Sequence, residues 1–186
     1  MLYNLAIVVV LVIRDMSEDM PKIEGRRSKE ELPPCSVEVF DIKKARFDDV
    51  KDDVMKIEGL AFDGKGYEED IMREDFENPQ AVIILLRNKD SQQIIGYVDA
   101  TPASEEVINI DSTALNPEYQ RYGLVWEMMK ELDEELKKRG YKYMTRDAKI
   151  EGGYAASVER FYGERIVEKS DHDSDYGPQR YMKIKF

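Results

Sequence analysis

The chain has 186 residues, of which 36% are charged and 42% hydrophobic, and its formal net charge is -11. This length suits one compact domain with a buried core, and the hydrophobic content excludes a disordered chain. The acidic excess disfavours nucleic-acid binding, because such a surface cannot neutralise phosphates. It could attract a cationic partner, although we favour the simpler interpretation that it keeps the protein soluble.

The chain begins with an apolar run over residues 5–13. The run is too short to span a bilayer, which needs about 20 residues, and it lacks the preceding positive charge of a signal peptide. We interpret it as an extra strand, or as an extension that packs on the domain or on a partner. A charged stretch follows, and then Pro33-Pro34 disfavours both a helix and a central strand. We therefore predict an N-terminal extension over residues 1–34 and a domain over residues 35–186.

The first half of the domain shows strand and helix periodicities in turn. Its single cysteine, Cys35, lies at the start and excludes an internal disulfide. The patterns predict a strand over residues 36–42, helices over residues 47–61 and 67–77, and strands over residues 81–86, 93–100 and 107–115.

The second half begins with the clearest helix, over residues 123–139, because its leucines and methionines form one apolar stripe. A strand over residues 141–149, a helix over residues 155–162, and strands over residues 166–168 and 181–186 follow. The single histidine, His172, excludes a multi-histidine metal site, and we expect the acidic residues around it to form a solvated loop. This order predicts an α/β fold, in which a mixed sheet carries helices on both faces.

The strongest functional signal lies between Ala114 and Trp126, where a strand ends, a short loop turns and the long helix begins at Gly123. The first amides of a helix lack intrahelical partners and lie at the positive end of its dipole, which makes an anion site. A glycine there lets the backbone approach a phosphate closely. The alternative is an ordinary strand–turn–helix in which the glycine serves packing alone, and we favour the anion site.

This passage resembles motif A of the GNAT superfamily of N-acetyltransferases, Gln/Arg-x-x-Gly-x-Gly/Ala, with Gln120, Gly123 and Val125 at its three marked positions. Val125 departs from the motif, because it is larger than glycine or alanine. The order of elements over residues 36–186 is also similar to that family. The resemblance implies a mixed, mostly antiparallel twisted sheet with a central splay and helices on both faces.

The resemblance also implies a cofactor, acetyl-CoA or another acyl-CoA. It would lie in the splay between the strands over residues 107–115 and 141–149, and its pantetheine arm would pair with strand backbone as an added strand does. The pyrophosphate would rest on amides at the helix start, with a charge-assisted contact from one arginine. The implied cofactor-binding residues are Leu115, Gln120, Arg121, Tyr122, Gly123, Leu124, Val125 and Trp126.

Direct acyl transfer to an amine needs a group that takes the amine proton and a group that protonates the leaving thiolate. The resemblance implies Tyr162, after the short helix, as the general acid; the alternative is a core tyrosine whose hydroxyl is satisfied. Asp111 is our candidate base, directly or through water, and strand alternation puts it on one face with Thr113 and Leu115. The alternative is that Asp111 only binds a cationic substrate or caps a neighbour, and Asp147 is the reserve base.

The predicted function is acyl-CoA-dependent N-acyl transfer, with acetyl transfer to a primary amine by direct attack in a ternary complex. The alternative is a catalytically degenerate CoA-binding regulatory protein, or a partner-binding protein, with the same fold. We expect a small-molecule or peptide amine as acceptor, and the acidic residues within 64–77 and 171–179 favour a cationic one. We further expect no metal, no nucleic-acid partner, no membrane span and a cytoplasmic location, and we leave a homodimer open.

Overall fold

The computed structural model describes residues 32–62 and 64–186. The apolar run of the N-terminal extension lies outside the described residues, and the division at residue 34 stays a prediction. The strands are β1 Cys35–Val39, β2 Val82–Asn88, β3 Ile94–Pro102, β4 Val107–Leu115, β5 Tyr143–Lys149, β6 Ile166–Ser174 and β7 Gly177–Lys185. The α-helices are α1 Lys51–Ala61, α2 Glu69–Glu77, α3 Leu124–Arg139 and α4 Tyr154–Tyr162, with short 3-10 helices over Phe47–Asp49, Pro117–Tyr119, Glu151–Gly153 and Gly163–Arg165.

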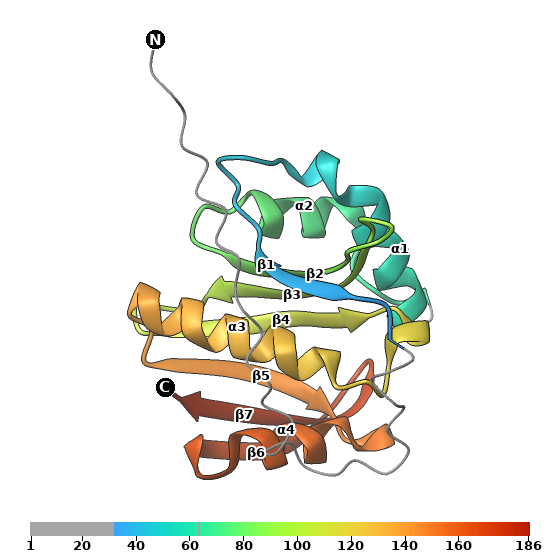
Figure 1. Cartoon of the computed structure of the whole chain (residues 1–186). Coiled ribbons are helices and arrows are strands. Elements are labelled where there is room, and N and C mark those ends of the chain that lie inside the picture. Colours follow the sequence, from blue (N-terminus) through green and yellow to red (C-terminus); the bar gives the residue numbers. More distant parts are fainter. Residues whose placement is uncertain (1–31, 63) are drawn as a thin grey trace.

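The seven strands form one sheet in the order β1-β2-β3-β4-β5-β7-β6 (Figure 1). All neighbouring strands are antiparallel except β4 and β5, which run parallel. A parallel pair needs a crossover connection, and α3 supplies it by crossing in front of the sheet in Figure 1. The predicted mixed, mostly antiparallel sheet is therefore confirmed.

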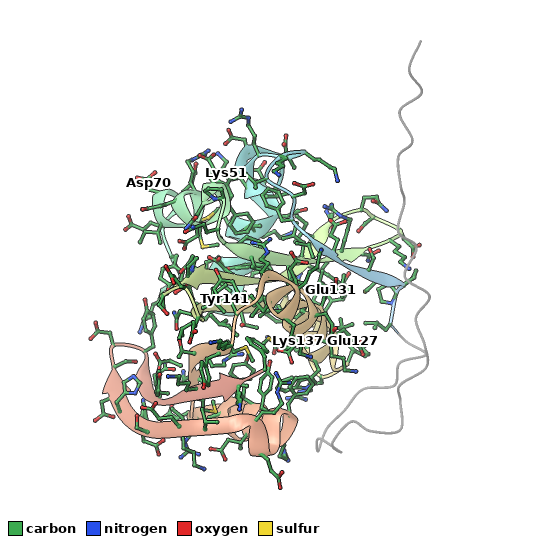
Figure 2. All side chains as sticks on the ribbon, turned by 90° about the vertical axis from the view of Figure 1, so that its left-hand side faces the viewer. Lys51, Asp70, Glu127, Glu131, Lys137 and Tyr141 are labelled. Carbon is green, nitrogen blue, oxygen red and sulfur yellow. The ribbon has the colours of Figure 1, made fainter. Side chains whose placement is uncertain are left out.

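Helices cover both faces of the sheet. Figure 2 places the labelled Lys51 and Asp70 of α1 and α2 on one side, and Glu127 and Glu131 of α3 on the other. The larger core lies under α3 and α4, because the apolar stripe of α3 packs there with every second residue of the central strands. The smaller core lies under α1 and α2 and is rich in aromatic rings. Among the described helices, none is long and apolar enough to cross a membrane.

The closing hairpin differs from the prediction. The sequence predicts only a short strand over residues 166–168 and a loop over residues 171–179, whereas β6 continues to Ser174 and pairs with β7 along its length. The loop prediction around His172 is therefore wrong. Since β6 is an edge strand with mostly exposed side chains, it carries no apolar alternation from which a strand could be recognised.

Two irregularities in β4 shape the centre of the sheet. β4 and β5 pair only from Val107↔Tyr143 to Ile110↔Arg146, and beyond this point the described strands separate. On the other edge of β4, Asp99 of β3 faces Ser112 while the next residue of β3 faces Ile110, so Asp111 is the extra residue of a β-bulge. The splay between β4 and β5 thus opens beside this bulge.

The bulge shifts the alternation of side chains along β4. Leu115 packs in the core under α3, and the Thr113 hydroxyl accepts a hydrogen bond from that side, whereas Asp111 contacts Asn109 and Thr101 on the opposite face. The prediction that Asp111 shares a strand face with Thr113 and Leu115 is therefore wrong. A strict period of two cannot reveal a single inserted residue.

Candidate active site

A cleft of about 760 Å³ lies at the splay and is the candidate active site. Its walls come from the end of α1 and the following loop, from β4 and β5, from the start of α4 and from the β6–β7 turn. The polar groups on these walls include Glu58, Tyr67, Asp111, Arg146, Asp147, Tyr154 and His172. The cleft therefore brings together two of the predicted site residues, Asp111 and Asp147, but not Tyr162.

Asp111 is held firmly in the wall of the cleft. Its Oδ2 accepts hydrogen bonds from the Thr101 amide at 3.1 Å and the Thr101 hydroxyl at 2.6 Å, and its Oδ1 accepts one from the Asn109 side chain at 2.6 Å. These contacts fix the orientation of the carboxylate in the bulge. Asp147, by contrast, is exposed on β5, with its Oδ1 3.5 Å from Nε2 of His172.

Another carboxyl in the cleft, Glu58, was missed by the sequence analysis. It lies on α1 and is only 2% exposed, and its carboxylate accepts hydrogen bonds from the Tyr67 amide at 2.8 Å and from the Tyr97 hydroxyl. The Tyr97 hydroxyl is also 3.2 Å from the hydroxyl of Ser112. Burial raises the pKa of Glu58. The available signal was an acidic residue within the apolar face of the helix, beside Ile57.

Behind this network, Asp99 of β3 is buried without a hydrogen-bond donor among the described residues. Burial first, and then the negative charge of Asp75 on α2, raises its pKa well above the usual value. A carboxylate in such a place loses its hydration without compensation, so the neutral acid is favoured.

Asp99→Asn is expected to raise the free energy of unfolding by about 2 kcal/mol at neutral pH. Because the Asp99 pKa is higher in the folded than in the unfolded chain, the folded state binds more protons between the two values, and stability falls as the pH rises through that window. Asparagine stays neutral, so the gain should vanish below about pH 4, where the unfolded carboxyl is protonated too. Urea unfolding at a series of pH values measures this.

The matched control is Asp173→Asn, which makes the same substitution on exposed strand β6. It should change the free energy of unfolding by less than about 0.5 kcal/mol at every pH. If Asp99→Asn were instead less stable than the wild type at neutral pH, the buried carboxyl would be stabilising. Our conclusion that its burial lowers the free energy of unfolding would then be wrong.

Arg146 and Tyr154 meet in the wall of the cleft and were also missed by the sequence analysis. Arg146 lies where the pairing of β4 and β5 ends and is 3% exposed. Its Nη2 donates to the Tyr154 hydroxyl at 2.7 Å and to the Thr113 hydroxyl at 3.3 Å, which bridges the splay. The sequence signal was an arginine between Met144 and Ala148, two residues that face the core.

Tyr162 lies on the same side of the sheet as Arg146 but outside the wall of the cleft. It is 3% exposed, and its hydroxyl donates to Asp133 of α3 at 3.3 Å. Arg165 pairs with the same carboxylate at 2.6 Å. Burial, together with the negative charge of Asp133, raises the pKa of Tyr162 well above its usual value, so this hydroxyl keeps its proton.

The predicted anion site lies where β4 leads into α3. Gly123 caps the helix with a left-handed φ of 83°, and Arg121 also has a positive φ, of 72°. A non-glycine residue with positive φ is strained, and such strain is frequent at ligand sites. Among the first amides of α3, that of Trp126 donates to the Gly123 carbonyl at 3.0 Å, whereas those of Leu124 and Val125 have no backbone acceptor among the described residues and can receive an anion.

The side chains of this segment leave its backbone available. Tyr122, Leu124 and Trp126 are buried, and Trp126 stacks on Phe161 of α4 with ring centroids 4.7 Å apart. Val125 is half-buried and packs against the larger core. A ligand would therefore meet mostly amides, with the exposed Arg121 side chain beside them.

The rest of the predicted cofactor site adjoins these amides. Leu115 ends β4, and its carbonyl accepts a hydrogen bond from the Gln120 side chain at 3.4 Å. Beyond Ile110 the edge of β4 that faces β5 has no strand partner in the described part of the chain, so it can pair with an extended polar chain. An elongated ligand with an anionic part fits this arrangement. In residues 32–62 and 64–186, no cluster of three histidine, cysteine or acidic side chains could hold a metal ion.

Comparison with known proteins connects this geometry to one family. The family model described as the acetyltransferase (GNAT) family matches residues 47–162. No curated protein matches the sequence.

Solved structures share the fold at low identity. The ribosomal-protein-S18-alanine N-acetyltransferase from Escherichia coli aligns with a TM-score of 0.63 and 14% identity over 81% of this chain and 92% of that chain. Ard1 from Thermoplasma volcanium aligns with a TM-score of 0.62 and 15% identity, over 82% of this chain and 98% of that chain. A GNAT family acetyltransferase from Elizabethkingia anophelis, with acetyl-CoA bound, aligns with a TM-score of 0.58 and 13% identity, over 82% of this chain and 98% of that chain.

Proposed function

The chain belongs to the acetyltransferase (GNAT) family, whose cosubstrate is acyl-CoA, and we propose that it transfers an acetyl or related acyl group to a primary amine by direct attack in a ternary complex. The observation that carries the proposal is the splay of β4 and β5 beside the start of α3. An unpaired strand edge and free helix amides lie there next to a cleft that an amine can enter.

The residues at the splay fit the acyl-CoA that the family uses. We propose that the edge of β4 up to Leu115 binds the extended arm, and that the amides from Arg121 to Trp126 bind the pyrophosphate. When bound, acyl-CoA supplies the activated thioester carbonyl. Val125 does not block this assignment, because its side chain packs against the core while its amide lies in the first turn of α3.

The cleft also contains groups that can accept the proton of the attacking amine. Asp111 remains our proposed base, directly or through a water, with Asp147 in reserve. Since both oxygens of Asp111 already accept hydrogen bonds, it is equally suited to hold the ammonium form of an acceptor. Glu58 is another carboxyl in the wall, and burial raises its pKa, which favours the uptake of a proton.

Two tyrosines can protonate the departing thiolate. Tyr162 is our proposed acid, because its high pKa keeps it protonated, although its hydroxyl must turn away from Asp133 to donate elsewhere. Tyr154 is the second candidate. Its oxygen accepts a hydrogen bond from Arg146, so its own proton remains available in the cleft.

A catalytically degenerate CoA-binding protein is the second candidate function. The observation that favours it is the bridge from Arg146 to Thr113 across the splay, together with the engaged oxygens of Asp111. The cytoplasmic location and the homodimer remain predictions.

A thiol-release screen tests the proposal. Purified protein is mixed with acetyl-CoA and longer acyl-CoA species against a panel of small and peptide amines, and free CoA thiol is measured. We expect release that depends on one class of amine. Binding of acetyl-CoA without thiol release from any amine would favour the degenerate candidate, and absence of both would refute the two candidates together.

A further inference from the structure

Arg146 is the most buried arginine among the described residues, and it has no carboxylate partner there. Other half-buried arginines of the described chain each pair with an acidic side chain within 4 Å. They are Arg73, Arg87, Arg165 and Arg180. Arg146 is thus the exception among these arginines, and its side chain is also the least exposed to water.

The donors of Arg146 are only partly used. Its Nη2 has two hydroxyl partners, but its Nη1 meets only the sulfur of Met129 at 3.8 Å, and its Nε has no hydrogen-bond partner among the described residues. An unpaired buried charge is costly, and its cost is offset when an anion binds against it. Nε and Nη1 lie on different edges of the guanidinium, and each of these edges also includes the engaged Nη2, so a carboxylate would be held by the charge and by a single charge-assisted hydrogen bond from Nε or from Nη1.

Neighbouring carboxylates of the chain are committed elsewhere. Asp111 accepts its hydrogen bonds from Thr101 and Asn109 on the opposite face of the sheet, and Asp147 is exposed beside His172. Asp133, the buried acidic residue of α3, pairs with Arg165. The missing anion must therefore come from outside the described chain.

We propose that Arg146 binds a carboxylate carried by a substrate, either on the amine acceptor or on the acyl group. This inference rests on the proposed acyl transfer, and it narrows the substrates to those with an acidic group close to the reacting atoms. The cleft reaches Arg146 at the splay, and the contacts with Tyr154 and Thr113 hold the guanidinium in place before a ligand arrives. Tyr154 also lies under the guanidinium, with the ring centroid 5.0 Å from Cζ.

A binding experiment without turnover tests the inference directly. N-acetylglycine represents a carboxylate on the acceptor, succinate represents one on the acyl group, and the corresponding amides are neutral controls. Titration of the full chain, followed by NMR, should show one of the two acids binding at least about tenfold more tightly than its amide. Arg146→Met should remove this difference, whereas Lys185→Met, which removes an exposed cation of neighbouring strand β7 outside the cleft, should keep it.

Two kinetic comparisons then show whether the carboxylate belongs to the amine acceptor or to the acyl group. With acetyl-CoA, glycine is compared with glycinamide; with glycinamide as acceptor, succinyl-CoA is compared with acetyl-CoA. One of these pairs should differ at least about tenfold in kcat/KM, and Arg146→Met should reduce that ratio towards one. Arg146→Lys, which keeps the charge but not the planar guanidinium held by Tyr154 and Thr113, should give an intermediate ratio.

The outcomes separate this inference from the proposed function. Carboxylate binding that depends on Arg146, without thiol release, supports the anion site and refutes acyl transfer with these substrates. Thiol release with no carboxylate preference in either experiment overturns the inference and leaves acyl transfer standing. A large loss of acetyl-CoA affinity in Arg146→Met, without any carboxylate preference, would assign the guanidinium to the cofactor and also overturn it.

Folding of the variants is checked by thermal unfolding. Arg146→Met should unfold at the same temperature as the wild type or higher, because methionine replaces an unpaired buried charge with an apolar chain of similar length. If this variant does not fold, Arg146→Lys carries the test, and an unchanged carboxylate preference in that variant would overturn the inference.

Discussion

Tyr162→Phe is expected to lower kcat by about 100-fold, while the affinity for acetyl-CoA changes by less than about threefold. The proton of this hydroxyl would be lost from the step in which the thiolate leaves, whereas the ring and its contact with Phe161 are kept. Burial holds the Tyr162 pKa well above its usual value, so the wild-type hydroxyl keeps the proton that it would donate. Steady-state kinetics and calorimetry together measure the two effects.

Tyr154→Phe is the matched variant, because it removes a hydroxyl from the same helix at the wall of the cleft. We expect a smaller loss of kcat than for Tyr162→Phe. The reverse order would transfer the role of acid to Tyr154. If neither variant lost activity, no tyrosine of α4 would act as the acid.

Gly123→Ala is expected to raise the Kd for acetyl-CoA by at least about tenfold. Gly123 has a φ of 83°, a conformation that costs a residue with a Cβ roughly 1–2 kcal/mol. Relief of this strain would turn the first amides of α3 away from the position at which they can receive a pyrophosphate. Calorimetric titration of the folded variant measures the change.

Gly140→Ala controls for the backbone strain itself. Gly140 caps the other end of α3 with a φ of 88°, and an added Cβ would meet no atom within 4 Å. Both variants should lose similar stability, but only Gly123→Ala should lose affinity. An equal loss of affinity in both would mean that the helix acts through its stability and that its first turn is not the binding site.

The long helix and the motif at its start were predictable because their signals are local. The stripe of α3 repeats with the helical period, the glycine at its start marks the turn, and β4 has the predicted bounds. Family membership also follows from this segment, since the matched region, residues 47–162, contains it. Edge strand β6 lacked such a signal because both of its faces are exposed to solvent.

The polar centre of the molecule was not predictable, because its members meet only across the sheet. The bulge at Asp111 depends on pairing with β3, and Glu58 lies 39 residues from its partner Tyr97. Arg146 stands out only once Met144 and Ala148 are known to face the core. In each case a charged residue broke an apolar pattern, but the sequence does not say which partner, if any, compensates it.

Calorimetric titration of the wild-type chain with acetyl-CoA tests most directly the claim that the splay and the start of α3 bind acyl-CoA. We predict one site per chain, with a Kd below about 1 mM, and a matching rise in the unfolding temperature. No heat of binding and no change in unfolding temperature with any acyl-CoA would contradict the claim.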